Sequence, residues 1–137
     1  MQLLVTDTAA ADDIAAIGSN LSAFNEQDVG VAERQALSVL VKASDGALLA
    51  GLNGYTAWGW LYIQWLWVGE NLRGQGMAGR MLEAAEDEAR NRGCGAAWID
   101  TFNPAAEKAY VRQGYVVFGE LADFPKGRSR KFLQKRF

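Results

Sequence analysis

The 137-residue chain contains no histidine and only one cysteine, and both scarcities restrict its chemistry. Without histidine there is no Ser-His or Cys-His nucleophile pair, no histidine general base and no histidine-ligated zinc. With Cys94 alone there is no disulfide framework, which favours a reducing, cytoplasmic location. Cys94 follows Gly93 at an expected helix end, so we interpret it as a small buried residue. Acid–base chemistry must therefore use tyrosine, carboxylate, lysine, cysteine or water.

Long apolar runs, proline and excess positive charge are also scarce. No apolar run reaches the roughly 18 residues that a membrane helix needs, and residues 1–7 lack the basic flank of a signal peptide. Two prolines and 50% apolar residues are typical of a compact fold, and one domain over residues 1–137 is expected. The net charge of −2 lacks the excess of positive charge that is typical of nucleic-acid-binding proteins. We interpret the basic residues of 126–136 as the solvated face of an edge strand.

Apolar periodicity predicts an ordered series of strands and helices. Strands are expected at 2–6, 36–42, 47–58, 60–68, 96–100, 115–121 and 129–134, and helices at 10–28, 76–92 and 105–113. The first helix carries Ile14, Ile17, Leu21 and Phe24 along one face. The strand at 60–68 is apolar on both alternating faces, so we expect a central strand that is covered on both sides. The element order predicts a mixed α/β fold, with a mostly antiparallel central sheet, flanking helices and one parallel strand–helix–strand unit.

A glycine-rich loop lies between the predicted strand at 60–68 and the helix at 76–92. Such a loop offers backbone N–H groups and the positive end of a helix dipole to an anion, and we interpret it as a pyrophosphate site rather than a plain connecting turn. The residues assigned to this site are Arg73, Gly74, Gln75, Gly76, Met77, Ala78 and Gly79.

Two nucleotide motifs compete for this loop. A P-loop requires Lys and Ser/Thr after its last glycine, and Arg80 and Met81 stand there instead. The dinucleotide fingerprint G-x-G-x-x-G does match, with Asp100 about 20 residues further on. The antiparallel strands before the loop and the short chain after Asp100 do not suit a doubly wound sheet. A small nicotinamide-nucleotide binder stays as a hypothesis that NAD binding would support.

The segment Arg73-x-x-Gly76-x-Ala78 resembles the R/Q-x-x-G-x-G/A acyl-CoA loop of the GNAT superfamily of N-acetyltransferases. The second signature of that family, N-x-x-A-x-x-x-Y-x-x-x-G-F, is matched by Asn103, Ala106, Tyr110 and Gly114, with Tyr115 in place of the phenylalanine. Small bacterial members also carry D-[ST]-F and F-P-K-G-x-x-x-x-F, which residues 100–102 and 124–132 match. The resemblance covers nearly the whole chain, although residues 1–58 match only in pattern.

The resemblance implies an acetyl-CoA-dependent N-acetyltransferase, in which a primary amine of a small molecule or peptide attacks the thioester directly in a ternary complex. Acetyl-CoA would be the co-substrate, and no metal is implied. Backbone groups of Trp67 and Val68 would bind the pantetheine arm and polarise the thioester carbonyl. Tyr110 would be the catalytic proton donor to the leaving thiolate. Asn103 either caps its helix or contacts the cofactor.

The central strand departs from the family pattern, because Gln64 stands where many relatives carry a carboxylate base. A water chain to Glu70, Asp100 or Asp123 remains open. The alternative function is therefore a non-catalytic acyl-CoA-binding or regulatory module. The expected partners are a small-molecule or peptidyl amine and a second copy in a homodimer, with no nucleic acid and no membrane. The acceptor amine itself is not identified by these residues.

Overall fold

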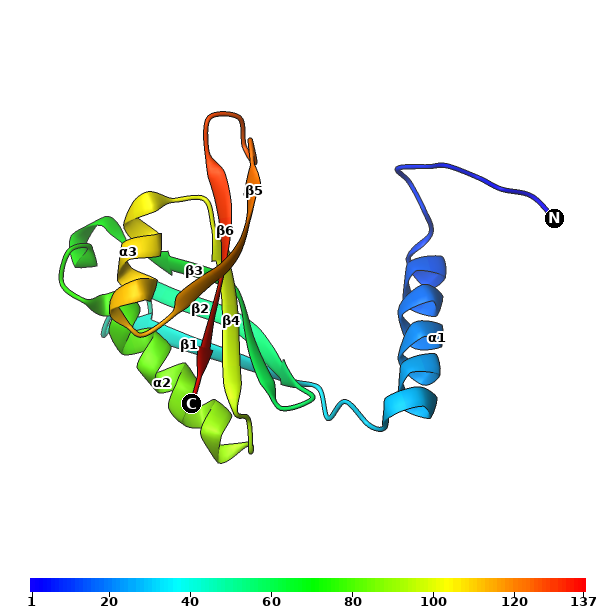
Figure 1. Cartoon of the computed structure of the whole chain (residues 1–137), viewed down its shortest axis with the longest axis horizontal. Coiled ribbons are helices and arrows are strands. Elements are labelled where there is room, and N and C mark those ends of the chain that lie inside the picture. The colour runs from blue at the N-terminus through cyan, green and yellow to red at the C-terminus, as the bar shows by residue number, and fades with distance from the viewer. The chain divides into compact units, whose positions relative to one another are not determined.

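The computed structural model describes residues 1–137 and contains three α-helices and six strands. In chain order these elements are α1 (Ala11–Val29), β1 (Gln35–Lys42), β2 (Leu48–Ala57), β3 (Trp60–Val68), the 3-10 turn η1 (Glu70–Leu72), α2 (Met77–Asn91), β4 (Ala96–Thr101), α3 (Pro104–Arg112), β5 (Val116–Ala122) and β6 (Ser129–Arg136) (Figure 1). The chain divides into two compact units, Met1–Ala32 and Glu33–Phe137. None of the helices is long and apolar enough to cross a membrane.

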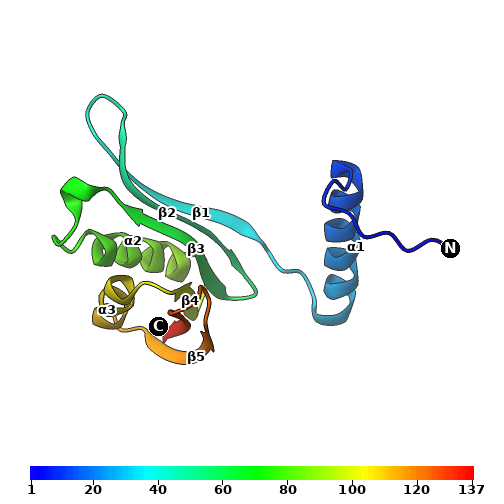
Figure 2. The same cartoon turned by 90° about the horizontal axis from the view of Figure 1, so that it is seen from above.

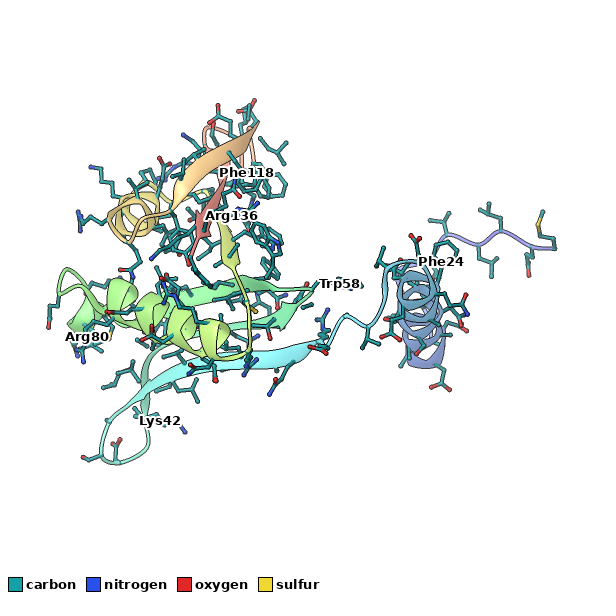
Figure 3. All side chains as sticks on the ribbon, turned by 60° about the horizontal axis from the view of Figure 1, so that its bottom comes forward. Phe24, Lys42, Trp58, Arg80, Phe118 and Arg136 are labelled. Carbon is teal, nitrogen blue, oxygen red and sulfur yellow. The ribbon has the colours of Figure 1, made fainter.

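The Met1–Ala32 unit consists of one helix preceded by an extended segment. The predicted helix at 10–28 is confirmed as α1, which ends before Gly30. The predicted strand at 2–6 is wrong, because these residues form no strand, and a strand requires a neighbour to pair its backbone groups. No residue of α1 is buried, and Phe24, labelled in Figure 3, projects from the helix with 68% of its surface exposed.

The Glu33–Phe137 unit is built on a six-stranded sheet with the order β1-β2-β3-β4-β6-β5. Only β3 and β4 pair in parallel, and α2 connects them, so the predicted mixed and mostly antiparallel α/β fold is confirmed. The basic strand β6 lies between β4 and β5 and is not an edge strand, which corrects our interpretation of residues 126–136. Its basic side chains pair with carboxylates of other elements, including Asp100 and Glu86.

Helices α2 and α3 lie beside each other on one side of this sheet (Figure 2). The apolar stripe of α2, centred on Leu82 and Ala85, packs with Leu61 and Ile63 of β3 in the hydrophobic core. Cys94 is buried there, as expected, and burial raises the pKa of its thiol. This side of the sheet therefore holds the core.

The expectation that β3 is covered on both sides is wrong at its carboxyl end. Leu66 and Val68 pack against the core, whereas Trp65 is 67% exposed and Trp67 is 50% exposed. Because side chains alternate across a strand, the two tryptophans point to the side of the sheet opposite α2. Both faces of β3 are apolar, as predicted, but at its carboxyl end only the face toward α2 packs against the core.

A buried ionic cluster that the apolar pattern did not reveal connects α2 to the end of the chain. Glu86 lies on the inner stripe of α2 and is only 1% exposed. Its carboxylate accepts hydrogen bonds from Lys135 and from the hydroxyl of Tyr115, and the Lys135 ammonium also donates to the carbonyl of Gln113. The carboxylate is thus compensated inside the core by one cation and one hydroxyl.

Candidate active site

The site begins where strands β3 and β4 stop pairing. Their parallel register runs from Trp60↔Ala96 to Ile63↔Ile99 and then ends, although β3 continues to Val68. At this point the register between β2 and β3 shifts, so that Gln64 is an extra residue between the pairs Gly54↔Ile63 and Asn53↔Trp65. Such a bulge bends the strand away from its neighbour. The edge of β3 beyond Ile63 is therefore open on the side of β4.

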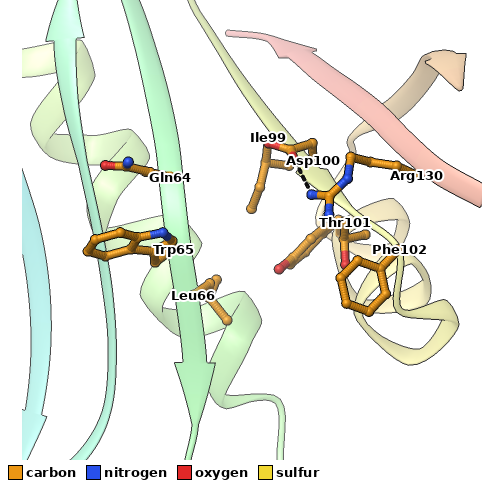
Figure 4. Close-up of a pocket in the computed structure, with 9 residues that line it drawn as sticks. Gln64, Trp65, Leu66, Ile99, Asp100, Thr101, Phe102 and Arg130 are labelled. Atoms are coloured by element: carbon orange, nitrogen blue, oxygen red, sulfur yellow. Dashed lines mark hydrogen bonds and ion pairs between the residues drawn. The ribbon is translucent and has the colours of Figure 1, made fainter. Parts of the chain in front are cut away.

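A pocket of about 210 Å³ lies at this opening (Figure 4). Figure 4 shows Gln64, Trp65 and Leu66 on β3, separated by a gap from Asp100 and Arg130. The residues that line the pocket are Gln64, Trp65, Leu66, Ile99, Asp100, Thr101, Phe102, Tyr110 and Arg130. Strand β3, strand β4, strand β6 and helix α3 thus contribute side chains to one space.

An ion pair forms the polar wall of the pocket. Nη1 of Arg130 donates to Oδ2 of Asp100 at 2.8 Å. The guanidinium of Arg130 also lies over the rings of Phe124 and Phe102, at 4.1 Å and 5.1 Å from their centroids. The Nε atom of Arg130 is buried without a hydrogen-bond partner. Sequence reasoning missed Arg130 because β6 was taken for an edge strand, although the basic residue two positions before Phe132 was visible.

Tyr110 is the predicted catalytic residue, and α3 places it in the pocket wall with 4% of its surface exposed. Burial, with a further contribution from the charge of Asp100, raises the pKa of Tyr110 to about 12. The neighbouring Tyr115 donates its hydroxyl to Glu86, whereas no protein group accepts a hydrogen bond from Tyr110. Tyr110 is therefore a neutral, protonated donor at any physiological pH.

Asn103 lies at the amino end of α3 as its N-cap. Its side-chain oxygen accepts hydrogen bonds from the backbone N–H groups of Ala105 and Ala106, at 2.8 Å and 3.2 Å. The capping interpretation is confirmed, and the contact of Asn103 with the cofactor stays a prediction. The cap fixes the start of the helix that carries Tyr110.

The glycine-rich loop lies beside the open end of β3. Gly74 and Gly76 have φ angles of 73° and 75°, a left-handed conformation that glycine adopts readily. Helix α2 begins at Met77 with no side chain capping its amino end, so the N–H groups of its first turn point out of the helix unpaired. Arg73 Nε donates to the carbonyl of Val68 at 2.9 Å and so ties the loop to the strand.

The predicted site residues thus lie in three places: the carboxyl end of β3 with the glycine-rich loop, the pocket wall, and the amino end of α3. The carboxyl end of β3, with Trp67 and Val68, is joined through Arg73 to the loop that continues to Gly79. Tyr110 stands in the wall of the pocket between β3 and β4. Asn103 serves its own helix. An open strand edge, a helix amino end and a neutral hydroxyl suit a ligand that combines an amide chain, a phosphate group and a reacting centre.

Comparison with known proteins agrees with this geometry. A family model described as the acetyltransferase (GNAT) family matches residues 10–115. Acetyltransferase Atu2258 of Agrobacterium fabrum is 42% identical over 137 residues, which is the full length of both chains. Blasticidin-S acetyltransferase of Streptomyces morookaense is 35% identical over 91 residues, or 66% of this chain and 67% of that protein. A crystal structure described as that of an acetyltransferase from Agrobacterium tumefaciens, 42% identical, superposes with a TM-score of 0.96 over 100% of both chains.

Proposed function

Because the chain belongs to the acetyltransferase (GNAT) family and is an N-acetyltransferase, we propose that it transfers an acetyl group from acetyl-CoA to a primary amine of a small molecule or peptide. The amine would attack directly, with both substrates bound in one ternary complex. The observation that carries this proposal is the divergence of β3 from β4 beside an uncapped helix amino end. That arrangement supports an extended amide-containing chain along β3 that ends in a pyrophosphate at α2.

The residues around the loop fit acetyl-CoA. A Cβ atom added to Gly74 or Gly76 would meet no other atom within 4 Å, so the space over these glycines is open to a ligand. The N–H groups of the first turn of α2 would hold the pyrophosphate, and Arg73 adds a positive charge at the mouth of the loop. Backbone groups of Trp67 and Val68 would bond the pantetheine arm as a neighbouring strand does. When bound, acetyl-CoA supplies an acetyl group activated as a thioester.

Tyr110 would act as the hydrogen-bond donor for the departing sulfur. A pKa of about 12 keeps its hydroxyl protonated, and this hydroxyl is not engaged by any protein acceptor. Its pKa lies about 3.5 units above that of an ordinary thiol, so complete proton transfer would be uphill by about 5 kcal/mol. The role that we propose is therefore stabilisation of the thiolate by a hydrogen bond, with the proton itself coming from the amine.

The acceptor amine would approach beside Asp100. Of the three carboxylates left open as bases, only Asp100 lines the pocket, while Glu70 and Asp123 do not. Its Oδ2 atom is held by Arg130, which fixes the carboxylate at the pocket wall. A water molecule between Asp100 and the incoming ammonium would accept one proton and leave a neutral amine to attack, while a second amine proton goes to the departing sulfur; this supports catalysis in spite of Gln64 on β3.

Likeness to blasticidin-S acetyltransferase makes an antibiotic amine one reasonable acceptor to test. The decisive experiment measures thiol release from acetyl-CoA with a panel of amines that includes blasticidin S, amino acids, polyamines and lysine peptides. We expect acetyl-CoA to raise the melting temperature more than NAD and one class of amine to release thiol. Binding of acetyl-CoA without thiol release for any amine would favour the non-catalytic module, and stronger stabilisation by NAD would overturn the proposal.

A further inference from the structure

Two apolar surfaces of this chain lie uncovered, each within its own unit. The first is the face of α1 formed by Ile14, Ile17, Leu21 and Phe24, whose side chains are between 57% and 69% exposed. Most helical stability in proteins comes from packing of an apolar face, and α1 has 19 residues of which none is buried. Nothing within Met1–Ala32 packs on this face, so it requires a partner surface.

The second surface is the side of the sheet opposite α2, which we call the outer face. It carries Leu40 of β1, Tyr55 of β2, Trp60, Tyr62 and Trp67 of β3 and Trp98 of β4. The three central rings form a continuous layer, since Tyr62 stacks on Trp98 at 4.1 Å and contacts Tyr55 edge-on at 5.4 Å. The helices of this unit, α2 and α3, are on the other side. An exposed aromatic sheet face of this kind is a surface on which an amphipathic helix packs.

Charge matches these two surfaces to each other. Residues 1–32 contain five acidic residues and no Lys or Arg, whereas all 14 Lys and Arg residues lie in 33–137. Two of the arginines lie on aromatic rings of the outer face: Arg34 is 3.7 Å from the ring centroid of Tyr55, and Arg136 is 4.6 Å from that of Trp60. An acidic helix with an apolar face is therefore complementary in charge to an apolar face rimmed by arginine.

We propose that α1 of a second copy of this chain covers the outer face, so that two chains exchange their first helices and form a dimer. The connection between α1 and β1 is short, residues 30–34, and it contains two residues in left-handed conformations, Gly30 with φ of 93° and Glu33 with φ of 53°. A short hinge with a strained non-glycine residue favours exchange of an element between identical chains over its return to the same chain.

The exchange also gives a partner to residues 2–6. Leu3, Leu4 and Val5 are strongly exposed, and this short apolar run predicts a strand. Strand β1 is an edge of the sheet, and its free backbone groups can pair with an added strand. Trp65 belongs to the same side of the sheet and also lines the pocket, so the partner's helix lies beside the candidate active site.

The first test is the mass of the full-length chain in solution, measured by light scattering on a sizing column. We expect a dimer. Leu21→Glu, which places a charge in the apolar face of α1, and Leu40→Glu, which places one in the outer face, should each give monomers. Ser19→Glu adds the same charge on the opposite side of α1 and should remain dimeric. A monomeric wild type, or Leu21→Glu chains that dimerise as the wild type does, would overturn the proposal.

A mixing experiment separates exchange from packing of α1 on its own chain. Chains carrying Leu21→Arg and chains carrying Leu40→Glu are each expected to be monomeric. A mixed dimer contains one unaltered helix on one unaltered outer face, and its other contact sets arginine against glutamate. Mixing should therefore restore dimers, and circular dichroism of each variant verifies that the sheet is folded. Folded variants that stay monomeric after mixing would refute the exchange.

Discussion

Replacing Tyr110 by phenylalanine removes one hydroxyl from the pocket and leaves the ring in place. The ring is 4% exposed and packs in the core, so the substitution preserves shape. No protein group loses a hydrogen bond, because the hydroxyl of Tyr110 has no protein acceptor. We therefore expect little change in the free energy of unfolding or in the dissociation constant of acetyl-CoA. The effect should fall on turnover.

The size of that effect follows from the pKa of Tyr110. At a pKa of about 12 the hydroxyl donates a hydrogen bond to a thiolate and does not surrender its proton. A hydrogen bond to a charged group contributes about 1.5–3 kcal/mol. Because each 1.36 kcal/mol corresponds to a factor of ten, kcat should fall roughly 10- to 150-fold. A general acid that transferred its proton completely would be worth about 100- to 10,000-fold.

The pH dependence gives a second and independent measurement. The neutral hydroxyl is the active form, so its contribution is complete at neutral pH and is lost as pH rises through the raised pKa of about 12. An unperturbed tyrosine would lose it near pH 10. The ratio of wild-type to Tyr110→Phe kcat should therefore stay constant from about pH 7 to about pH 10.5. A ratio that falls toward one near pH 10, or equal activity of the two enzymes, would refute the reasoning.

Tyr115→Phe provides the matched control for this experiment. Tyr115 is a second buried tyrosine, with its ring centroid 6.5 Å from that of Tyr110. Its hydroxyl donates to the buried carboxylate of Glu86 and does not line the pocket. The control variant should lose stability by about 1–3 kcal/mol while kcat changes little. The opposite pattern in the two variants separates a chemical role from a structural one.

Three further substitutions, two of them with a control variant, test other parts of the structure. Lys135→Met leaves the buried Glu86 without its cation and should cost about 3–5 kcal/mol in urea unfolding, whereas Lys135→Met combined with Glu86→Leu should recover most of the loss. Arg73→Ala should raise the dissociation constant of acetyl-CoA roughly 10- to 150-fold in a titration, and Arg90→Ala, at the other end of α2, should not. Gly54→Ala would force a Cβ into a backbone carbonyl of β3, so we expect a loss of about 1–3 kcal/mol together with lost activity.

Local patterns in the sequence were sufficient for the elements other than the expected strand at 2–6, and for the position of the loop. The stripe through Leu82 and Ala85 correctly predicted α2, and the glycines before it predict an anion site, because both patterns depend on neighbours within one turn. Distant pairings were not visible. Glu86 and Lys135 are 49 positions apart, so nothing in either local pattern predicts that they meet inside the core. A carboxylate placed one residue after Ala85 on an apolar stripe was the only signal.

The candidate site was predicted in part for the same reason. Tyr110 and the loop were found from local motifs, whereas Arg130 reaches the pocket only because β6 pairs with β4 in the interior of the sheet. The prediction of a strand at 2–6 is wrong because these residues have no neighbouring strand within their unit with which to pair their backbone groups. Strand pairing is a non-local property, and one amphipathic pattern fits several partners equally well.

The opening between β3 and β4 depends on residues that have no chemistry of their own. Gln64 is one residue too many for the ladder with β2, and Gly54 opposite it admits the approach of the Tyr62 carbonyl that any Cβ would block. The pairing with β4 ends at the same point, after Ile63, and beyond the extra residue Leu66 and Val68 lie on the core side. A strand bent at this point frees its backbone for a ligand while its side chains still anchor it. Gln64 therefore acts through its position in the backbone, and Asp100, which lines the same pocket across the gap, is the carboxylate that we propose as the base.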